Sequence, residues 1–167
     1  MANKEVYTTE EITAIYERHW KTVWRVCYSF MKNIPDTEDM VQETFMKLIN
    51  SRRKLSDADH EKAWLIVTAS NACKDCLKHW SRYAEDIDEH DELCAQDDTD
   101  KLPYERLTKA ILALPAKYKT EVYLYFYEGY TTAEIAKLLH IPHATVRTGL
   151  RRAKAILKKE LGDEYYG

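Results

Sequence analysis

The sequence predicts an all-α protein with two small helical domains joined by an acidic linker, the C-terminal domain being a helix-turn-helix. Only 4 Gly and 4 Pro occur in 167 residues, so residues that break helices are scarce. Apolar residues recur at intervals of three and four along most of the chain, which is the pattern of amphipathic helices. The formal net charge is only −3, but acidic and basic residues concentrate in different segments. Together these patterns favour a helical protein with a basic, anion-binding end and an acidic connector over a β-rich fold.

The first domain, residues 1–83, should contain three helices. The first runs from about Thr9 to Lys32, and the second from an N-cap at Asp36 to about Asn50. A polar loop separates it from a third helix over about 61–82. The spacing of apolar residues predicts the buried positions, which are Ile12, Ile15, Tyr16, Trp20, Val23, Trp24, Cys27, Phe30 and Met31 in the first helix, Val41, Phe45, Leu48 and Ile49 in the second, and Ile66, Ala69, Cys73, Cys76, Leu77 and Trp80 in the third.

The linker, residues 84–101, is strongly acidic. Between Tyr83 and Asp100 the chain carries nine Asp or Glu residues and no Lys or Arg. Such a composition buries too little apolar surface to fold by itself. We therefore expect this segment to connect two domains.

The second domain, residues 102–167, should contain four helices. They span about 103–114, 116–128 and 132–139, with the last beginning near His143. Tyr118, Val122, Tyr125 and Phe126 should be buried in the second of these. Thr131 and Glu134 fit a capping box for the third. Two short helices joined by a tight turn, the second of them basic, have the form of a helix-turn-helix.

The last two predicted helices have a net positive charge. From Thr132 to Leu161 there are seven Lys or Arg residues and two Glu residues, a net charge of +5. Arginine matches guanine edges and phosphates with two parallel hydrogen bonds, and threonine can donate, accept or touch a thymine methyl group. A solvated basic helix without a ligand is the alternative. The combination of cap, short helix, turn and basic helix favours DNA binding.

Other function classes receive no support. No apolar run approaches the roughly 20 residues of a membrane span, so membrane insertion is not expected. The N-terminus lacks the layout of a signal peptide, which predicts a cytoplasmic protein with reduced cysteines. There is no nucleophile–base pair and no phosphate-binding loop, so we expect no enzyme, no cofactor, no metal and no small-molecule substrate.

Three segments resemble a known family. The C-terminal segment YKTEVYLYFYEGYTTAEIAKLLHIPHATVRTGLRRAKAILKKEL is similar to the −35-binding domain of bacterial RNA polymerase sigma factors of the extracytoplasmic-function (ECF) type. DTEDMVQETFMKL resembles the segment with which these factors grip the polymerase clamp helices, and AWLIVTASNACKDCLKHW resembles their −10 recognition segment. The resemblance implies a factor that binds core RNA polymerase and promoter DNA, works at the nucleoid when bound to polymerase, and has an inhibitory anti-sigma partner.

The resemblance and the residue chemistry together assign three sets of contact residues. Acidic, amide and aromatic side chains should meet the polymerase: Asp39, Gln42, Glu43 and Phe45. The −10 element should meet Arg52, Arg53, Lys54, Trp64, Asn71, Lys74, Lys78 and Arg82. The −35 element should meet Thr132, His143, Ala144, Thr145, Arg147, Thr148, Arg151, Arg152 and Lys154.

Alternatives stay open at several of these positions. Phe45 and Trp64 both fit a core position as well as a contact. Cys73, Cys76 and His79 have the spacing of a zinc or redox site, but two buried, metal-free thiols on one continuous helix are the favoured interpretation. The rival functions are therefore a stand-alone helix-turn-helix regulator and a cysteine-based zinc or redox sensor.

The last helix departs from the resembled pattern at two positions. A glycine commonly precedes the Thr-Val pair, where this chain has Ala144, and an arginine commonly precedes the next leucine, where it has Gly149. Glycine in a helix costs about 1 kcal/mol relative to alanine. We expect Gly149 to face outward with Thr145 and Arg152, so that a DNA contact is lost and the backbone can approach the duplex. Drift at a tolerant surface site is the alternative.

Overall fold

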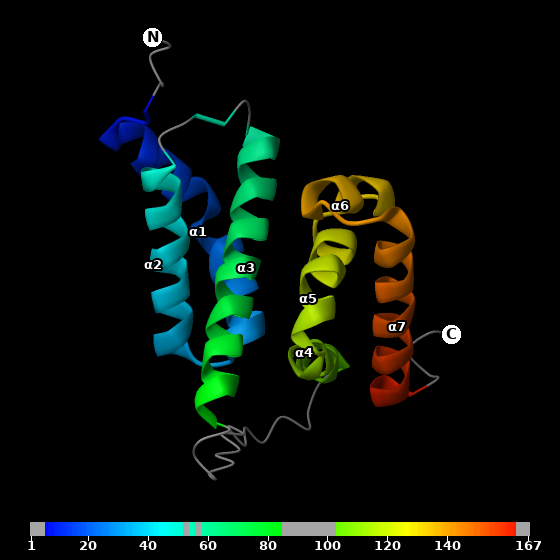
Figure 1. Ribbon diagram of the computed structural model, residues 1–167. Coiled ribbons are helices and arrows are strands. Elements are labelled where there is room, and N and C mark those ends of the chain that lie inside the picture. The colour runs from blue at the N-terminus through cyan, green and yellow to red at the C-terminus, as the bar shows by residue number, and fades with distance from the viewer. Residues whose placement is uncertain (1–5, 52–53, 56–57, 85–102, 163–167) are drawn as a thin grey trace.

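The computed structural model describes residues 6–51, 54–55, 58–84 and 103–162, and these ranges are helical except for short connections (Figure 1). The N-terminal half holds α1 (Thr9–Met31), α2 (Ile34–Asn50) and α3 (Ala58–Ala84). The C-terminal half holds α4 (Pro103–Ala113), α5 (Ala116–Val122), the π-helical segment η1 (Tyr123–Tyr127), α6 (Thr132–Leu139) and α7 (His143–Leu161). The acidic segment at 85–102 lies outside the described residues. Within the described ranges, no helix is long and apolar enough to cross a membrane.

Local capping sets the ends of the first two helices. The Glu11 backbone N–H donates to Thr8 Oγ1 at 3.2 Å, and the Thr8 N–H donates to Glu11 Oε2 at 2.7 Å, which completes a capping box for α1. The expected N-cap of α2 was wrong. Asn33, not Asp36, caps this helix by accepting the Asp36 N–H at 2.9 Å. Pro35 fits inside the first turn because the missing N–H there has no helical partner to lose.

The three N-terminal helices enclose a core in which Val23, Leu65 and Ile66 are completely buried. Each such side chain contributes about 1.5–3 kcal/mol when it leaves water. The predicted buried stripes were too wide: Tyr16, Trp20, Ile49 and Trp80 lie at the surface, with 37–45 % of their areas exposed. In a bundle of only three helices, the two neighbours cover a narrow stripe of each helix and leave its flanks in water.

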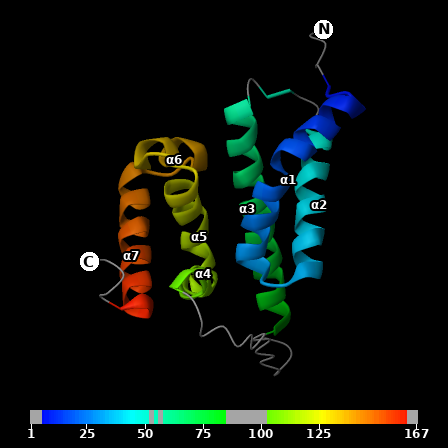
Figure 2. The same ribbon diagram turned by 180° about the vertical axis from the view of Figure 1, so that it is seen from behind.

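In the C-terminal half, α5 lies between α3 and α7 in both views (Figures 1 and 2). Leu124, Ile135 and Val146 are completely buried where η1, α6 and α7 meet. Phe126 was expected in this core, but 51 % of its surface is exposed. The physical reason is η1, in which the Glu128 N–H reaches back to the Tyr123 carbonyl oxygen at 3.3 Å. The wider π-helical turn rotates the following side chains relative to an α-helix.

The two halves pack against each other through α5 and its neighbours on one side and α1 and α3 on the other. Lys119 of α5 is buried, and its Nζ donates to the backbone carbonyl oxygens of Ser29 in α1 and Leu112 in α4. Lys62 of α3 forms an ion pair with Glu128 at 2.6 Å. A buried hydrogen bond and a partly exposed ion pair therefore join the halves.

Candidate nucleic-acid interface

The helix-turn-helix consists of α6, a three-residue turn and α7. Thr131 caps α6 by accepting the Glu134 N–H at 3.2 Å, which supplies the threonine half of the expected capping box. His140 ends α6 in the left-handed conformation, with φ of 55°, and its N–H bonds the Ala136 carbonyl oxygen. Pro142 then precedes α7, and the Thr145 N–H donates to its carbonyl oxygen at 3.0 Å. The turn directs α7 away from α6, so that α7 runs alongside α5 (Figures 1 and 2).

The basic helix α7 is divided into a buried and an exposed face. Leu150, Ala153 and Leu157 join Val146 in the core. Most of the residues expected to meet the −35 element lie on the opposite, exposed face, and they are His143, Ala144, Thr145, Arg147, Arg151, Arg152 and Lys154. Thr148 is half-buried. The face is a continuous surface of cationic and hydroxyl side chains, which suits contacts with phosphates and base edges.

Two side-chain interactions hold the edges of this face. The Thr132 hydroxyl and His143 Nε2 lie 2.6 Å apart, so the start of α6 is tied to the start of α7. Lys154 lies over the rings of Tyr125 and Phe126, at 5.3 and 5.6 Å from their centroids. The π-helical segment thus provides two aromatic surfaces that orient a basic side chain of α7.

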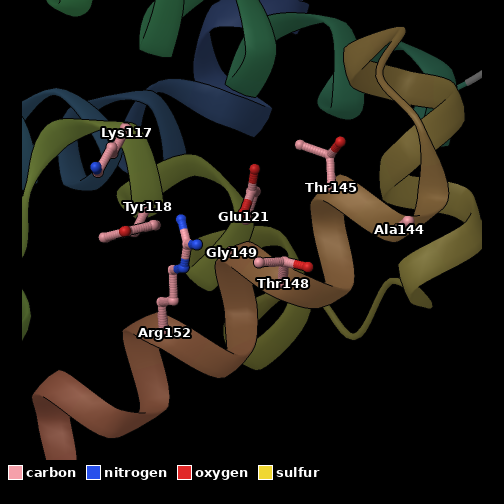
Figure 3. A pocket seen from close by; sticks show the side chains of 8 residues that line it. All are labelled: Lys117, Tyr118, Glu121, Ala144, Thr145, Thr148, Gly149 and Arg152. Atoms are coloured by element: carbon pink, nitrogen blue, oxygen red, sulfur yellow. The ribbon is translucent and has the colours of Figure 1, made fainter.

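Gly149 does not face outward as expected; it is buried against α5 (Figure 3). A Cβ atom built on Gly149 would overlap Oε2 of Glu121 and stand 3.2 Å from its Cδ. The side chain of Glu121 therefore fills the place that a side chain at position 149 would occupy. Periodicity could not show this, because the residue that covers Gly149 belongs to another helix. Burial raises the pKa of Glu121, and the positive charge of Lys74 opposes that shift.

The residues expected at the −10 element are distributed along α3. Asn71, Lys78 and Arg82 are exposed, whereas Trp64 and Lys74 are half-buried. Burial lowers the pKa of Lys74, and the nearby carboxylate of Glu121 opposes that shift. Lys54, in the loop before α3, forms an ion pair with Glu11 at 2.9 Å. Arg52 and Arg53 lie outside the described residues.

The residues expected to contact polymerase divide into two environments. Asp39, Gln42 and Glu43 form an exposed polar surface on α2, where Glu43 also pairs with Lys47 at 3.3 Å. Phe45 is only 6 % exposed, and its ring packs against Tyr16 with centroids 4.9 Å apart. Phe45 is therefore a core residue and not an exposed anchor.

The cysteines of α3 were expected to be buried together, and the structure separates them. Cys73 is completely buried, whereas Cys76 is half-buried. A hydrogen bond with Cys27, followed by burial, raises the pKa of Cys73 well above its ordinary value. In the described part of the chain, no group of three or more His, Cys, Asp or Glu side chains could hold a metal ion.

Comparison with known proteins identifies the two halves. Residues 15–83 match Sigma-70 region 2, and residues 104–157 match Sigma-70 region 4. The RNA polymerase sigma factor SigV of Bacillus subtilis is 27 % identical over 164 residues, covering 98 % of each chain. The ECF RNA polymerase sigma factor SigW of the same organism is 26 % identical, covering 84 % of this chain and 83 % of SigW. The chain belongs to the ECF family of RNA polymerase sigma factors. It is thus a sigma factor that binds core RNA polymerase and directs promoter-specific transcription initiation.

The fold of this sigma factor also has a solved counterpart. The sigma factor RpoE of Bartonella quintana, in complex with the anti-sigma factor NepR, matches it with a TM-score of 0.72 and 18 % identity. The match covers 92 % of this sigma factor and 98 % of RpoE. The arrangement of helices is therefore shared at low sequence identity.

Two buried charged residues of this sigma factor were not predicted from the sequence. Lys119 and Glu121 sit in a short helix that reads as an ordinary amphipathic segment, yet both are buried. The only sign of their burial in the sequence is that each charged residue stands next to an apolar one, Tyr118 or Val122. It does not reveal which distant segment each side chain meets.

Proposed function

We propose that this sigma factor reads the −35 element with the exposed face of α7. The observation that carries the proposal is the continuous cationic and hydroxyl surface on a helix held by a helix-turn-helix. Arg147 and Arg151 are exposed on α7, and a guanidinium group can make two parallel hydrogen bonds to guanine. Lys154, placed by two aromatic rings, suits a phosphate contact.

The −10 element is assigned to the exposed side of α3. Asn71 offers an amide for a base edge, and Lys78 and Arg82 offer charge for the backbone phosphates. Trp64 and Lys74 join this surface from half-buried positions, and Lys54 lies in the loop before α3. We assign Arg52 and Arg53, which lie outside the described residues, to the same promoter element. Capture of an unstacked base requires such a mixture of charge and planar groups.

Core polymerase is assigned to the polar surface of α2. Asp39, Gln42 and Glu43 stand on successive turns of a helix whose opposite face is in the core. Acidic side chains at the rim of an interface accelerate association with a basic partner surface. Phe45 lies on the buried face of α2 and holds this helix against α1 through its contact with Tyr16.

These assignments are tested by run-off transcription with core polymerase on a promoter library. Arg151→Ala should lower transcription and relax the preference at one −35 position, by about 1–3 kcal/mol for a lost forked contact. Lys159→Ala, on the exposed end of the same helix, is the matched control and should leave the preference unchanged. Equal effects of the two variants on every promoter would contradict the −35 assignment.

A regulatory partner is part of the same proposal. The structural counterpart RpoE is seen in complex with an anti-sigma factor. We infer that an anti-sigma factor similarly inhibits this protein. We also infer that this sigma factor acts in the cytoplasm with polymerase and performs no catalysis itself. Co-purification of a binding partner that blocks transcription in vitro tests this. A stand-alone regulator is not favoured, because it has no use for a region that matches Sigma-70 region 2.

A further inference from the structure

The start of α1 is tied to the connection between α2 and α3. The Leu55 backbone N–H donates to the Tyr7 hydroxyl oxygen at 2.7 Å, although the two residues lie 48 positions apart in the sequence. Lys54 Nζ lies 2.9 Å from Oε1 of Glu11, which is 43 positions away. In both views the segment 54–55 lies at the end of the three-helix bundle where α1 begins (Figures 1 and 2). Two contacts of different kinds therefore fix this connection to α1.

The Tyr7 contact holds the backbone of the connection. Tyr7 and Leu55 are half-buried, and both side chains pack against the core. A backbone N–H that is shielded from water needs an acceptor, and Leu55 lies outside the helices, where no helical carbonyl oxygen supplies one. The Tyr7 hydroxyl supplies this acceptor from a distant part of the chain. The position of the backbone at Leu55 therefore depends on Tyr7.

The Glu11 contact holds a charged side chain. Glu11 Oε2 accepts the Thr8 N–H at 2.7 Å as part of the capping box of α1, and its Oε1 pairs with Lys54. The hydrogen bond from the Thr8 N–H, followed by the one from Lys54, lowers the pKa of Glu11, so the carboxylate is charged at neutral pH. The carboxylate that caps α1 therefore also orients the amine of Lys54.

A third contact fixes the first turn of α3. Glu61 is only 6 % exposed, and its Oε1 atom accepts from Arg18 at 3.0 Å and lies 2.8 Å from His19 Nε2. Both partners belong to α1. Lys54 and Trp64, which are assigned to the −10 element, lie on either side of Glu61 in the sequence. The helix α1 therefore holds the connection and the start of α3 as one unit.

We propose that Tyr7 and Glu11 are positioning residues for the −10 element, which hold the Leu55 backbone and the Lys54 amine where promoter DNA meets them. Neither residue needs to touch DNA. A connection that became ordered only on binding would lose conformational entropy at that step, so fixing it beforehand strengthens recognition. This inference rests on the proposed assignment of Lys54 and α3 to the −10 element.

The test uses two conservative variants in complex with core polymerase. Tyr7→Phe removes only the hydroxyl group, and Glu11→Gln keeps an oxygen for the capping box but removes the charge. Each holoenzyme transcribes two promoter libraries, one randomised over the −10 element and the other over the −35 element. Loss of one hydrogen bond corresponds to a factor of about two to ten. Each variant should weaken the −10 preference by this factor and leave the −35 preference unchanged.

Two matched controls lie on the same helix. Tyr28→Phe makes the same change near the opposite end of α1, and Glu10→Gln makes the same change at the exposed neighbour of Glu11. Both controls should keep the wild-type preferences at the two promoter elements.

Hydrogen exchange of the complete protein makes the test independent of transcription. In Tyr7→Phe the Leu55 amide should exchange about two to ten times faster than in the wild type, because its acceptor is gone. The amides of the completely buried Val23 and Leu65 should keep their wild-type rates, which shows that the variant is folded. Unchanged exchange at Leu55 would overturn the inference.

The transcription outcomes separate the inference from the proposed function. If the wild type shows no −10 preference, the assignment of Lys54 and α3 fails and the inference fails with it. If the wild type shows a preference that both variants retain while transcription falls equally on every promoter, Tyr7 and Glu11 are structural only and the inference is overturned. Equal weakening of the −10 and −35 preferences would indicate general destabilisation and would likewise overturn it.

Discussion

Lys119 of α5 donates a hydrogen bond to the backbone carbonyl oxygen of Ser29 in α1, and its charge also lies 5.6 Å from the centroid of the Phe30 ring. This contact places a cation in the interface between the region 4 half and the region 2 half. The pKa of Lys119 falls from 10.5 to about 7, chiefly because of burial and secondly because of Lys32. Packing of the two halves is therefore coupled to the loss of a proton.

The first prediction follows from the sign of that shift. Below about pH 7 the Lys119 amine is charged even when the halves are packed, so packing is weakest there. Between about pH 7 and 10.5 the amine has lost its proton in the packed form but keeps it in the separated form, so rising pH favours packing. Compactness in small-angle X-ray scattering should therefore increase as the pH rises through this window. Lys119→Met should abolish the pH dependence. Wild-type pH dependence retained by Lys119→Met would contradict this assignment.

The ion pair of Lys62 and Glu128 gives a second prediction. The Glu128 side chain is 12 % exposed and the Lys62 side chain 35 % exposed. The pair should therefore stabilise the packing of the two halves by about 1 kcal/mol, the upper end of the range for exposed ion pairs. Lys62→Glu should loosen the two halves in the same scattering experiment. The swap Lys62→Glu with Glu128→Lys should restore compactness, and high salt should weaken the wild-type contact. A swap that fails to restore it would mean that the pair does not join the halves.

The third prediction separates the core from the surface of α2. Phe45→Ala should destabilise the protein by about 3–5 kcal/mol in urea unfolding, because it empties a buried site against Tyr16. Asp39→Ala should leave stability within about 0.5 kcal/mol and weaken binding to core polymerase. The opposite pattern, a stable Phe45→Ala variant that loses polymerase, would place Phe45 at the interface after all.

Gly149 of α7 gives a fourth prediction. Gly149→Ala should destabilise the wild-type protein, because the new Cβ must displace the buried carboxylate of Glu121. In a Glu121→Ala background the same change should stabilise by about 1 kcal/mol, the helix preference of alanine over glycine. Urea unfolding of the four proteins measures this reversal of sign. An identical effect in both backgrounds would show that the two residues are not coupled.

The fifth prediction concerns Cys73. Its raised pKa and complete burial should make the thiol unreactive toward iodoacetamide until the protein unfolds. Replacing Cys73 and Cys76 together by serine should lower stability and leave promoter preference unchanged. Loss of promoter-specific transcription by a folded double variant would instead support a cysteine-based sensor.

The sequence by itself determined the helices, the turn between α6 and α7, and the basic face of α7. These features depend on local interactions. Capping residues such as Thr8 and Thr131 bind the backbone N–H three residues further on, and the spacing of apolar residues depends on one helix alone. Family resemblance then supplied the function that the comparisons confirmed.

Only the tertiary structure decided which flank of each helix is covered. Gly149 was expected to face DNA and is covered by Glu121, while Phe126 was expected in the core and is exposed by the π-helical turn of η1. Both outcomes depend on contacts between helices or on a shift of hydrogen-bond register that leaves no periodic signal. The burial of Lys119 of α5 against α1 has the same origin, since Ser29, one of the two residues whose carbonyl oxygens it contacts, lies 90 positions away in the sequence.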